Sequence, residues 1–550
     1  MGVRRGVLDP SHRRFIKRTG LPSAAAGLLA AGLLWAGLLP PPPRTQRDNI
    51  QDVIFGVTIP DPYRWLEDQK SPQTRAWIDE QDTYSHSILS KIPGREAIRK
   101  RLSELMKVDA VSLPRERKGR YFFMKRTADQ VLPSIYMREG RSGKDVLMVD
   151  PFPMSPDHST SVTLDDVSRD GKLLAYGVRQ GGEDQTTVHL FDVDSRKNLT
   201  DVLPRADYSS ISLTLDKAGI YYGVYGPHGP GLYYHKIGAH LSDHEIDGQG
   251  LDRRHFLYAE MVGDRRYLLI TDGYGAGNVT DIYAKDVARD GPVFPVAKGL
   301  NAMSYGRVVG DQAYLRTNWK APRGRVLRID LKNPSQRYWR TIVPQSPNVI
   351  DDFDVIGGKL FVSYLKDASS SLRVFDPNGH PAKDITFPAL GTVQGLSGDW
   401  DSKTAYYEYS SFFIPPTIYA YDVETGQQEV WWKARVPVPS HRLALQQVWY
   451  PSKDGTRIPM FLVHSQDLKL DGTHPTLLTA YGGFDLNMTP IFSPVAVLWA
   501  EEGGVFALPN LRGGGEFGEA WHRAGMLSNK QNVFDDFLYA AQWLVQNHYT

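Results

Sequence analysis

The residues best placed to do chemistry lie in two glycine-rich turns near the C-terminal end of the sequence. Tyr481 begins the first turn, "YGGF", directly after the short apolar run 476–480, and the second turn, "NLRGGGEFG", follows the apolar run 505–508. Both runs predict short, buried, parallel strands. Ligands of α/β sheets bind at the carboxyl ends of such strands, where glycine lets the backbone approach closely.

Tyr481 is the polar side chain at the first of these junctions. Its phenol could donate a hydrogen bond to a developing negative charge, as a side chain does in an oxyanion hole. The alternative is a tyrosine packed in the core, which is an ordinary fate of a large aromatic ring. Spacing alone leaves both interpretations open.

Four separated motifs carry a resemblance to a known family. "DPYRWLED" (61–68), "YGGF" (481–484), "NLRGGGEFGEAWH" (510–522) and "NKQNVFDDF" (529–537) occur in family order, and the chain resembles the prolyl oligopeptidase family of serine peptidases from about residue 48 to residue 550. The resemblance implies a serine endopeptidase, needing no cofactor or metal, that cleaves short peptides after proline. It also implies that the Tyr481 hydroxyl helps to hold the oxyanion and that Phe484 lines the proline pocket.

The nucleophile that this family needs is not found in the sequence. No Gly-x-Ser-x-Gly elbow occurs in the 550 residues, and the family's elbow would follow about a dozen residues beyond Thr550. We therefore expect a truncated chain that lacks the Ser, Asp and His of the triad and is inactive as it stands. Two alternatives stay open: a non-catalytic truncated propeller protein, and an oligopeptidase that cleaves after basic residues, whose pocket would need carboxylates rather than an aromatic wall.

Other catalytic and binding classes find little support. The dense histidines His228, His235, His240 and His244 match no zinc spacing. With 64 Lys+Arg against 62 Asp+Glu, the near-neutral charge gives no case for nucleic acid. The absence of cysteine excludes disulfides, thiolate metal sites and a cysteine nucleophile.

The N-terminus is typical of an export signal. Arg13, Arg14, Lys17 and Arg18 precede the apolar run 21–39, and "SHRRFIK" resembles a twin-arginine signal with His12 in place of the first arginine. "PPPP" (40–43) follows where a cleavage site would stand, so an uncleaved membrane anchor is an alternative. We expect an exported chain, periplasmic or membrane-anchored, or a cytoplasmic one if the start codon is wrongly assigned.

An internal repeat predicts the architecture of residues 109–436. Strands that follow a turn align at steps of 54, 46, 47, 46, 46 and 46 residues, as read from the numbers of Phe122, Tyr176, Tyr222, Leu269, Leu315, Phe361 and Tyr407. All-strand repeats of this length predict a seven-bladed β-propeller rather than a solenoid, whose turns are shorter. Such a propeller over an active site would admit oligopeptides and exclude folded proteins by size.

The flanking segments predict an α/β-hydrolase domain, incomplete at the C-terminus. We expect residues 48–108 to form its N-terminal arm, residues 437–550 its first part, and the whole chain to be a monomer. A hairpin should turn at Asp454 and Gly455, and without further strands residues 505–508 should form an exposed sheet edge. The helix 532–548 should be capped by Asn532 and should bury one apolar face, comprising Val533, Phe537, Ala541, Leu544 and Val545.

Overall fold

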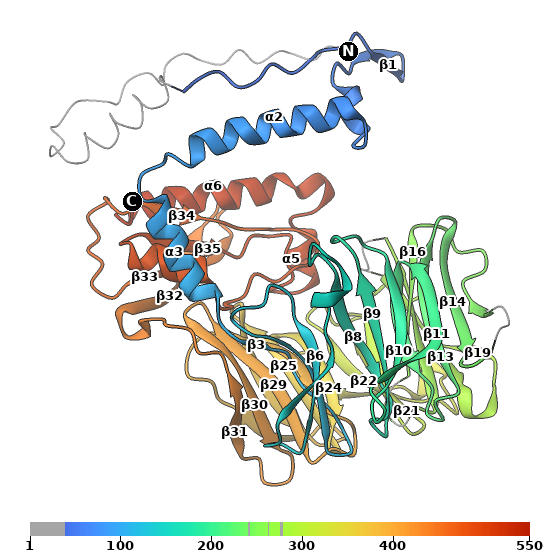
Figure 1. The fold of residues 1–550 in the computed structure, drawn as a ribbon. Coiled ribbons are helices and arrows are strands. Elements are labelled where there is room, and N and C mark those ends of the chain that lie inside the picture. Colours follow the sequence, from blue (N-terminus) through green and yellow to red (C-terminus); the bar gives the residue numbers. More distant parts are fainter. Residues whose placement is uncertain (1–38, 240–242, 262, 264, 276–278) are drawn as a thin grey trace. The chain divides into compact units, whose positions relative to one another are not determined.

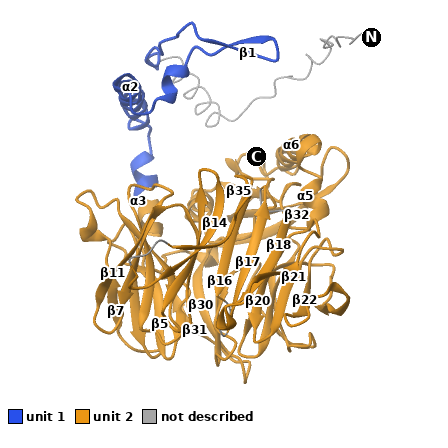
Figure 2. Cartoon of the chain, turned by 90° about the vertical axis from the view of Figure 1, so that its right-hand side faces the viewer, with its two compact units in different colours: residues 1–100 blue, residues 101–550 orange. Residues whose placement is uncertain are grey.

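The structure is a computed structural model that describes residues 39–239, 243–261, 263, 265–275 and 279–550. The chain divides into two compact units, residues 1–100 and residues 101–550 (Figure 2). The basic segment and nearly all of the apolar run expected to direct export lie outside the described residues. In the part that is described, no helix is both long enough and apolar enough to cross a membrane.

The first unit contains a hairpin and helices. Strands β1 (Gln51–Ile54) and β2 (Val57–Pro60) pair antiparallel, and a 3-10 helix, η2 (Arg64–Glu67), and helix α2 (Pro72–Leu89) follow. Ser71 caps α2, because its Oγ accepts a hydrogen bond of 3.1 Å from the Thr74 N–H. Arg64 forms ion pairs with Asp61 and Asp52, so the charges of "DPYRWLED" stabilise the unit's own turn.

Seven antiparallel sheets make up residues 110–433 (Figure 1). Their strands are β3 (Ala110–Val111), β4 (Arg115–Arg117), β5 (Arg120–Arg126), β6 (Ser134–Glu139) and β7 (Asp145–Val149) in blade 1; β8 (Ser161–Val167), β9 (Leu173–Arg179), β10 (Thr186–Asp192) and β11 (Lys197–Ala206) in blade 2; β12 (Tyr208–Leu213), β13 (Gly219–Gly226), β14 (Gly229–Lys236) and β15 (His244–Asp247) in blade 3; β16 (His255–Met261), β17 (Tyr267–Tyr274), β18 (Val279–Asp286) and β19 (Val293–Ala297) in blade 4; β20 (Ser304–Val309), β21 (Gln312–Thr317), β22 (Arg325–Asp330) and β23 (Arg340–Val343) in blade 5; β24 (Val349–Ile356), β25 (Lys359–Lys366), β26 (Ser369–Phe375) and β27 (Pro381–Ile385) in blade 6; and β28 (Thr392–Ser397), β29 (Thr404–Ser411), β30 (Ile414–Asp422) and β31 (Gln428–Lys433) in blade 7. The chain therefore forms the predicted seven-bladed propeller.

The sequence repeat corresponds to one strand of each blade. All seven aligned residues lie in the strand that is second in the order of its sheet, from Phe122 in β5 to Tyr407 in β29, and each step of 46 or 47 residues is one complete blade. The first step is longer because the connection between β7 and β8 contains a 3-10 turn, η3 (Phe152–Met154). The second strand gives the clearest signal because it is buried between two neighbours, as in β9 and β25.

Neighbouring blades are joined by apolar side chains rather than by shared strands. Blades 1 and 2 pack through a cluster that includes Phe122, Ile135 and Leu174. Blade 7 meets blade 1 in the same way, with Tyr406 packed edge-on against Tyr121. Among the described strands, none crosses from blade 7 into blade 1, so side-chain contacts rather than a shared strand close the ring.

The C-terminal part is a mixed sheet with helices, the beginning of the predicted α/β-hydrolase domain. Its strand order is β32 (Leu443–Pro451), β33 (Arg457–Ser465), β35 (Val505–Pro509) and β34 (Thr476–Leu478), accompanied by helices α4 (Pro494–Glu501), α5 (Glu519–Arg523) and α6 (Gln531–Gln546). The hairpin turn at Asp454 and Gly455 is confirmed, as is the parallel pairing of β34 with β35. Helix α3 (Arg95–Met106) contributes Leu105 to the core of this sheet.

Two expectations about strand burial are wrong. Strand β34 is only half-buried, because β35 is its one partner in the described sheet. Strand β35 is fully buried between β33 and β34, so β34 and not residues 505–508 forms the edge. The apolar run predicts a strand but does not say which strands will flank it.

Helix α6 also departs from its predicted capping and face. It begins at Gln531 after Lys530, and Asn532 does not cap it but donates to the Ala524 carbonyl from the first turn. Its buried residues are Val533, Asp536, Ala540 and Leu544, whereas Ala541 and Val545 are exposed and Phe537 is half-buried. The face is rotated because a charged residue, Asp536, is drawn into the interior by a buried arginine described below.

Candidate active site

Tyr481 and Phe484 lie in the loop that follows β34, at the carboxyl end of that strand. Tyr481 is 50% exposed and Phe484 is 66% exposed, and their ring centroids are 6.5 Å apart. A half-exposed ring is not a packed core tyrosine, so that alternative does not describe Tyr481. Its hydroxyl has no hydrogen-bond partner among the described residues, and it is therefore free to donate to a bound molecule.

The backbone of this loop is strained next to the two aromatic side chains. Phe484 and Asp485 both have positive φ, at 53° and 59°. This left-handed conformation costs a residue with a Cβ roughly 1 kcal/mol or more, and it persists only where surrounding contacts hold it. Two such residues in succession indicate that the loop is held in a set shape.

Glycine is required where this loop meets the second turn. A Cβ on Gly482, which has φ +65°, would lie 2.6 Å from Val533 Cγ1 and 2.9 Å from Leu511 Cβ. The Gly482 carbonyl also accepts a hydrogen bond of 2.7 Å from Lys530 Nζ. The first turn is thus pressed between α6 and the second turn, as the predicted close backbone approach requires.

A buried arginine anchors the second turn to α6 and to the β32–β33 hairpin. Arg512 and Asp536 are both buried, and Arg512 Nη2 lies 2.6 Å from Asp536 Oδ1 while the Arg512 N–H donates to Oδ2 at 3.1 Å. Arg512 Nη1 also contacts Asp454 Oδ2 at 2.5 Å, and Ser452 Oγ donates to Asp536 Oδ1 at 2.6 Å. With its hydrogen bonds satisfied on several sides, this ion pair can exist in a low-dielectric interior.

The segment after Phe484 joins the sheet to the propeller. Asp485 N–H lies 3.2 Å from the Gly513 carbonyl and 3.1 Å from His522 Nδ1. Asn487 Nδ2 donates to Asp351 Oδ1 of blade 6 at 2.8 Å. Burial raises the pKa of Asp351 to about 6, and the pKa of Asp485 is raised for the same reason. Titratable groups with raised pKa values therefore lie directly beside the candidate loop.

Sequence reasoning missed the polar residues that shape the site: Asp485, Glu516, Arg512 and Asp536. The available signal was a charged residue on each side of three glycines, as in "RGGGE", within an otherwise apolar and glycine-rich segment. A charge in such a segment predicts either solvent exposure or burial, and only the fold shows that both are buried, Arg512 with Asp536 as its partner and Glu516 without a charged partner among the described residues.

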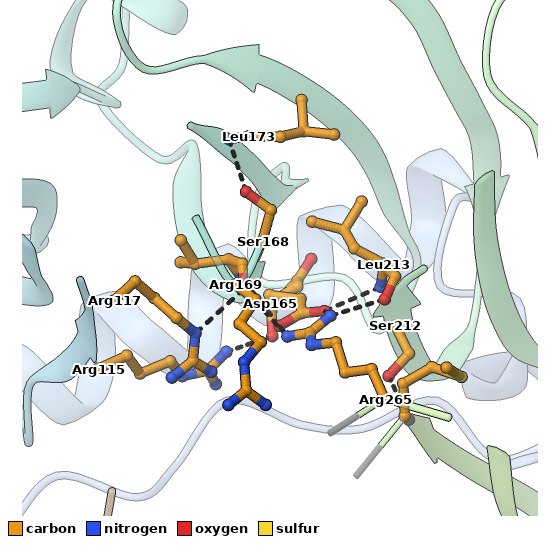
Figure 3. Close-up of polar contacts among 12 residues, drawn as sticks. Arg115, Arg117, Asp165, Ser168, Arg169, Leu173, Ser212, Leu213 and Arg265 are labelled. Atoms are coloured by element: carbon orange, nitrogen blue, oxygen red, sulfur yellow. Dashed lines mark hydrogen bonds and ion pairs between the residues drawn. The ribbon is translucent and has the colours of Figure 1, made fainter. Parts of the chain in front are cut away.

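The propeller has a central cavity of about 260 Å³, called the bore here, to which all seven blades contribute. Arg265 reaches from blade 4 to Asp166 of blade 2, with Nη2 2.7 Å from Oδ1, and donates to the Leu213 carbonyl of blade 3 (Figure 3). Arg117 of blade 1 pairs with Asp399 of blade 7 at 2.9 Å. The first pair joins blades that are not neighbours, the second joins the two blades that close the ring, and together they line the bore with both signs of charge.

Among the histidines that were weighed as metal ligands, His235 lies between two carboxylates. His235 Nδ1 lies 2.8 Å from Asp243 Oδ1 and Nε2 lies 3.3 Å from Asp201 Oδ1. His240 lies outside the described residues. His522 is buried against the Gly513 carbonyl, with Nδ1 2.8 Å from the oxygen, so it helps to hold the second turn.

Comparison with known proteins assigns both parts of the chain. Residues 42–434 match the prolyl oligopeptidase N-terminal beta-propeller domain, and residues 490–550 match the prolyl oligopeptidase family domain. The chain is 33% identical over 522 residues to the prolyl endopeptidase of Elizabethkingia meningoseptica, a match that covers 92% of this chain and 73% of the relative. It is 28% identical over 564 residues to prolyl oligopeptidase A of Galerina marginata, covering 92% of this chain and 76% of the relative.

Solved structures agree with this assignment. A prolyl endopeptidase structure superimposes with a TM-score of 0.88 at 37% identity, covering 92% of this chain and 77% of its own. Prolyl oligopeptidase B of Galerina marginata, bound to a 35mer hydrolysis and macrocyclization substrate, superimposes with a TM-score of 0.86 at 25% identity, with the same coverage. Because one family model matches residues 42–434, a second matches residues 490–550, and a prolyl endopeptidase is 33% identical over 92% of this chain, the chain belongs to the prolyl oligopeptidase family of serine peptidases.

Proposed function

We propose that the protein is a serine endopeptidase that cleaves short peptides on the carboxyl side of proline. The observation that carries the proposal is the free, half-exposed Tyr481 hydroxyl at a strand end, on a strained loop that also presents Phe484. A preorganised donor of this kind stabilises negative charge that develops only in the transition state.

Phe484 supports proline as the residue at the cleaved bond. Its ring is 66% exposed, and it lies beside the ring of Tyr481 at an interplanar angle of 42°. A flat apolar wall suits the rigid pyrrolidine ring, whereas a pocket for arginine or lysine would place carboxylates at its base. Asp485 is the neighbouring carboxylate, and burial raises its pKa, which disfavours the charged form that a basic substrate would need.

The propeller supports short peptides as the substrate class. Its bore holds only about 260 Å³ and is crossed by the Arg265–Asp166 ion pair. A folded domain cannot pass such an opening, whereas an extended peptide can reach a site between domains. We propose that the protein acts as a monomer on peptides of this kind and needs no metal or organic cofactor.

We infer that a polypeptide of these 550 residues alone does not hydrolyse peptides. It contains Tyr481 and Phe484 but no Gly-x-Ser-x-Gly elbow. Loss of the triad lowers the rate by about 10⁶-fold in known serine peptidases. The alternative function, a non-catalytic propeller protein, predicts inactivity for every product of the gene.

The proposals are tested with the product of the whole reading frame beside a polypeptide ending at Thr550. We expect the former to cleave a Gly-Pro chromogenic substrate far faster than its Gly-Arg counterpart and the latter to cleave neither. Preference for Gly-Arg would support cleavage after basic residues, and inactivity of both proteins would support the non-catalytic alternative.

Tyr481→Phe tests the oxyanion role in the active protein. We expect kcat to fall by about 10²- to 10³-fold with little change in KM, because the hydrogen bond forms with the transition state. Tyr338→Phe is the matched control, since Tyr338 is 48% exposed on the propeller. An unchanged kcat in Tyr481→Phe would contradict the assigned role.

We also propose that the protein is exported to the periplasm or held at a membrane by its N-terminal segment. The support is the order of basic residues followed by the apolar run 21–39. Cell fractionation of the tagged protein tests this, and a wholly cytoplasmic protein of full length would overturn it.

A further inference from the structure

The carboxyl group of Glu516 is buried beside the candidate site without a charged partner. Glu516 is 1% exposed, and its Oε1 accepts hydrogen bonds from the Met488 N–H at 2.9 Å and from Asn510 Nδ2 at 3.3 Å. Within the described residues, no lysine, arginine or histidine pairs with it, and Oε2 has no hydrogen-bond partner. A carboxylate in this setting would be an uncompensated buried charge.

Glu516 and Asn510 together fix the end of the strained loop. Asn510 is fully buried directly after β35, and its N–H donates to the Pro459 carbonyl at 2.9 Å. Its Nδ2 donates to the Met488 carbonyl at 2.5 Å, while Glu516 accepts from the Met488 N–H. The N–H and the carbonyl of Met488 are thus both hydrogen-bonded to side chains of the segment that begins directly after β35, an interior strand of the sheet.

The same carboxyl group forms the back wall of the three-glycine turn. A Cβ on Gly514 would lie 2.3 Å from Glu516 Oε2 and 2.8 Å from the Leu486 carbonyl oxygen. A Cβ on Gly515 would lie 2.7 Å from the Asp485 carbonyl oxygen. The turn is therefore pressed between Glu516 on one side and the strained loop on the other, with no room for a side chain.

The surroundings of Glu516 favour its neutral form. Burial raises the pKa of Glu516 to about 7, and the hydrogen bonds from Met488 and Asn510 only partly oppose this effect. Asn510 Oδ1 is also buried without a partner, so a proton on Glu516 supplies a donor to a pocket rich in acceptors.

Other titratable or charged groups around this pocket come from three elements and the loop itself. They are Asp485 on the loop, His522 and Glu519 on or near α5, Arg316 on β21 and Asp351 on β24. Asp485 adds to the cost of a charge on Glu516. Arg316 points its guanidinium to the Ile350 carbonyl, with Nη2 3.0 Å from the oxygen, so it does not neutralise Glu516.

We propose that Glu516 is a positioning residue whose neutral carboxylic acid holds the loop of Tyr481 and Phe484 in its strained shape, and whose ionisation releases that loop. On ionisation the proton passes to solvent, and the buried charge then favours opening of the pocket to water. The effect on catalysis rests on the function proposed above, whereas the effect on the loop does not.

The loop is tested by amide hydrogen exchange on the 550-residue chain, followed by mass spectrometry of peptides covering residues 481–493. After correction for intrinsic exchange, we expect protection to fall by up to about tenfold per pH unit as pH rises from 5 to 7 and to level off above 7, because in this range the closed loop keeps the proton on Glu516 whereas the open loop releases it. Glu516→Gln should hold its protection from pH 5 to 8, since the amide stays neutral and its Oε1 can still accept. Glu502→Gln, an exposed change at the end of α4, should behave as the wild type.

Two outcomes would overturn the proposal. One is a wild-type loop whose protection does not change between pH 5 and 7 while peptides from β25 serve as the internal reference. The other is a pH dependence that remains unchanged in Glu516→Gln, which would mean that another carboxyl group, Asp485 or Asp351, is the one that titrates. The variants Asp485→Asn and Asp351→Asn would show which of the two it is. If Glu516→Gln fails to fold, Glu516→Ala still decides, because an intact loop without the carboxyl group contradicts the role.

A second measurement separates this inference from the proposed function. In an active protein, Glu516→Gln should keep kcat free of the decline that the Glu516 titration imposes on the wild-type kcat as pH rises toward 7, with a smaller change in KM. Absence of peptidase activity would overturn the proposed function and would leave the exchange result standing.

Discussion

The propeller and the hydrolase sheet bury their strands to different degrees. Blades 2 to 7 each have four strands and blade 1 has five, with inner positions covered by the neighbouring blade, so that β9 and β25 are almost entirely buried. The hydrolase sheet has β34 half-buried at its edge, and α6 leaves Phe534, Leu538 and Val545 exposed. The apolar side chains of the propeller therefore bury one another, whereas the hydrolase region leaves apolar side chains exposed that other residues could cover.

Both regions nevertheless rely on a buried arginine and aspartate. Arg265 and Asp166 join three blades across the bore, and Arg512 and Asp536 join a turn, a hairpin and a helix. Neither pair connects sequence neighbours. In each region the pair holds together segments whose backbones are not hydrogen-bonded to each other. Side-chain hydrogen bonds fix such segments more specifically than apolar packing does.

Limited proteolysis gives the broadest test of this contrast. We expect protease to trim the 550-residue chain from its C-terminal end toward residue 437, while a fragment near residues 110–433 persists. Each exposed large apolar side chain forgoes about 1.5 to 3 kcal/mol of burial, and α6 has three of them. Mass spectrometry of the fragments provides the measurement, and equal survival of both regions would contradict the comparison.

Removal of one partner from a buried pair should have the next largest effect. Asp536→Ala leaves the buried Arg512 with only the half-exposed Asp454 as its partner, so we expect a loss of about 3 to 5 kcal/mol in unfolding free energy, confined to the hydrolase region. Asp166→Ala is the counterpart in the propeller and should destabilise that region instead. Denaturant unfolding with regional hydrogen exchange separates the two. A small uniform loss in both variants would show that neither pair governs its own region.

Two adjacent residues of α6 test the orientation of the helix. Leu544 is 1% exposed in the core cluster, and Val545 is 57% exposed. Leu544→Ala should lower the unfolding free energy by about 2 to 5 kcal/mol, whereas Val545→Ala should change it by no more than about 0.5 kcal/mol. Comparable losses would restore the face that periodicity predicts and would contradict the structure.

The smallest expected effect concerns Asp454 at the rim of the Arg512 cluster. Burial acts to raise its pKa, but hydrogen bonds from Arg512 and Thr456 outweigh this and lower the pKa to about 2. A lowered folded-state pKa adds stability above the unfolded value near 4, and this stability is lost as pH falls toward 2. Because Asp454 is about half exposed, Asp454→Asn should cost about 1 kcal/mol or less at pH 7 and nothing near pH 2. Thermal unfolding at both pH values measures the difference.

The sequence by itself determined the propeller and its blade number. The repeat from Phe122 to Tyr407 was visible because, in each blade, the strand that carries it is buried between two partner strands and therefore keeps the same residue types. It also determined the Asp454–Gly455 hairpin and the two parallel strands, since turn residues and apolar runs act locally. The glycines of both turns marked the candidate site for the same reason.

Only the tertiary structure decided what those elements face. Periodicity assigned Val545 to the core, whereas the Arg512 side chain draws Asp536 inward and turns the helix. The tertiary structure alone also showed that β34 forms an edge of the sheet, that Tyr481 is exposed and that Glu516 is buried without a positively charged partner in the described part of the chain. Burial and pairing depend on residues far apart in the chain, and a local pattern carries no record of those partners.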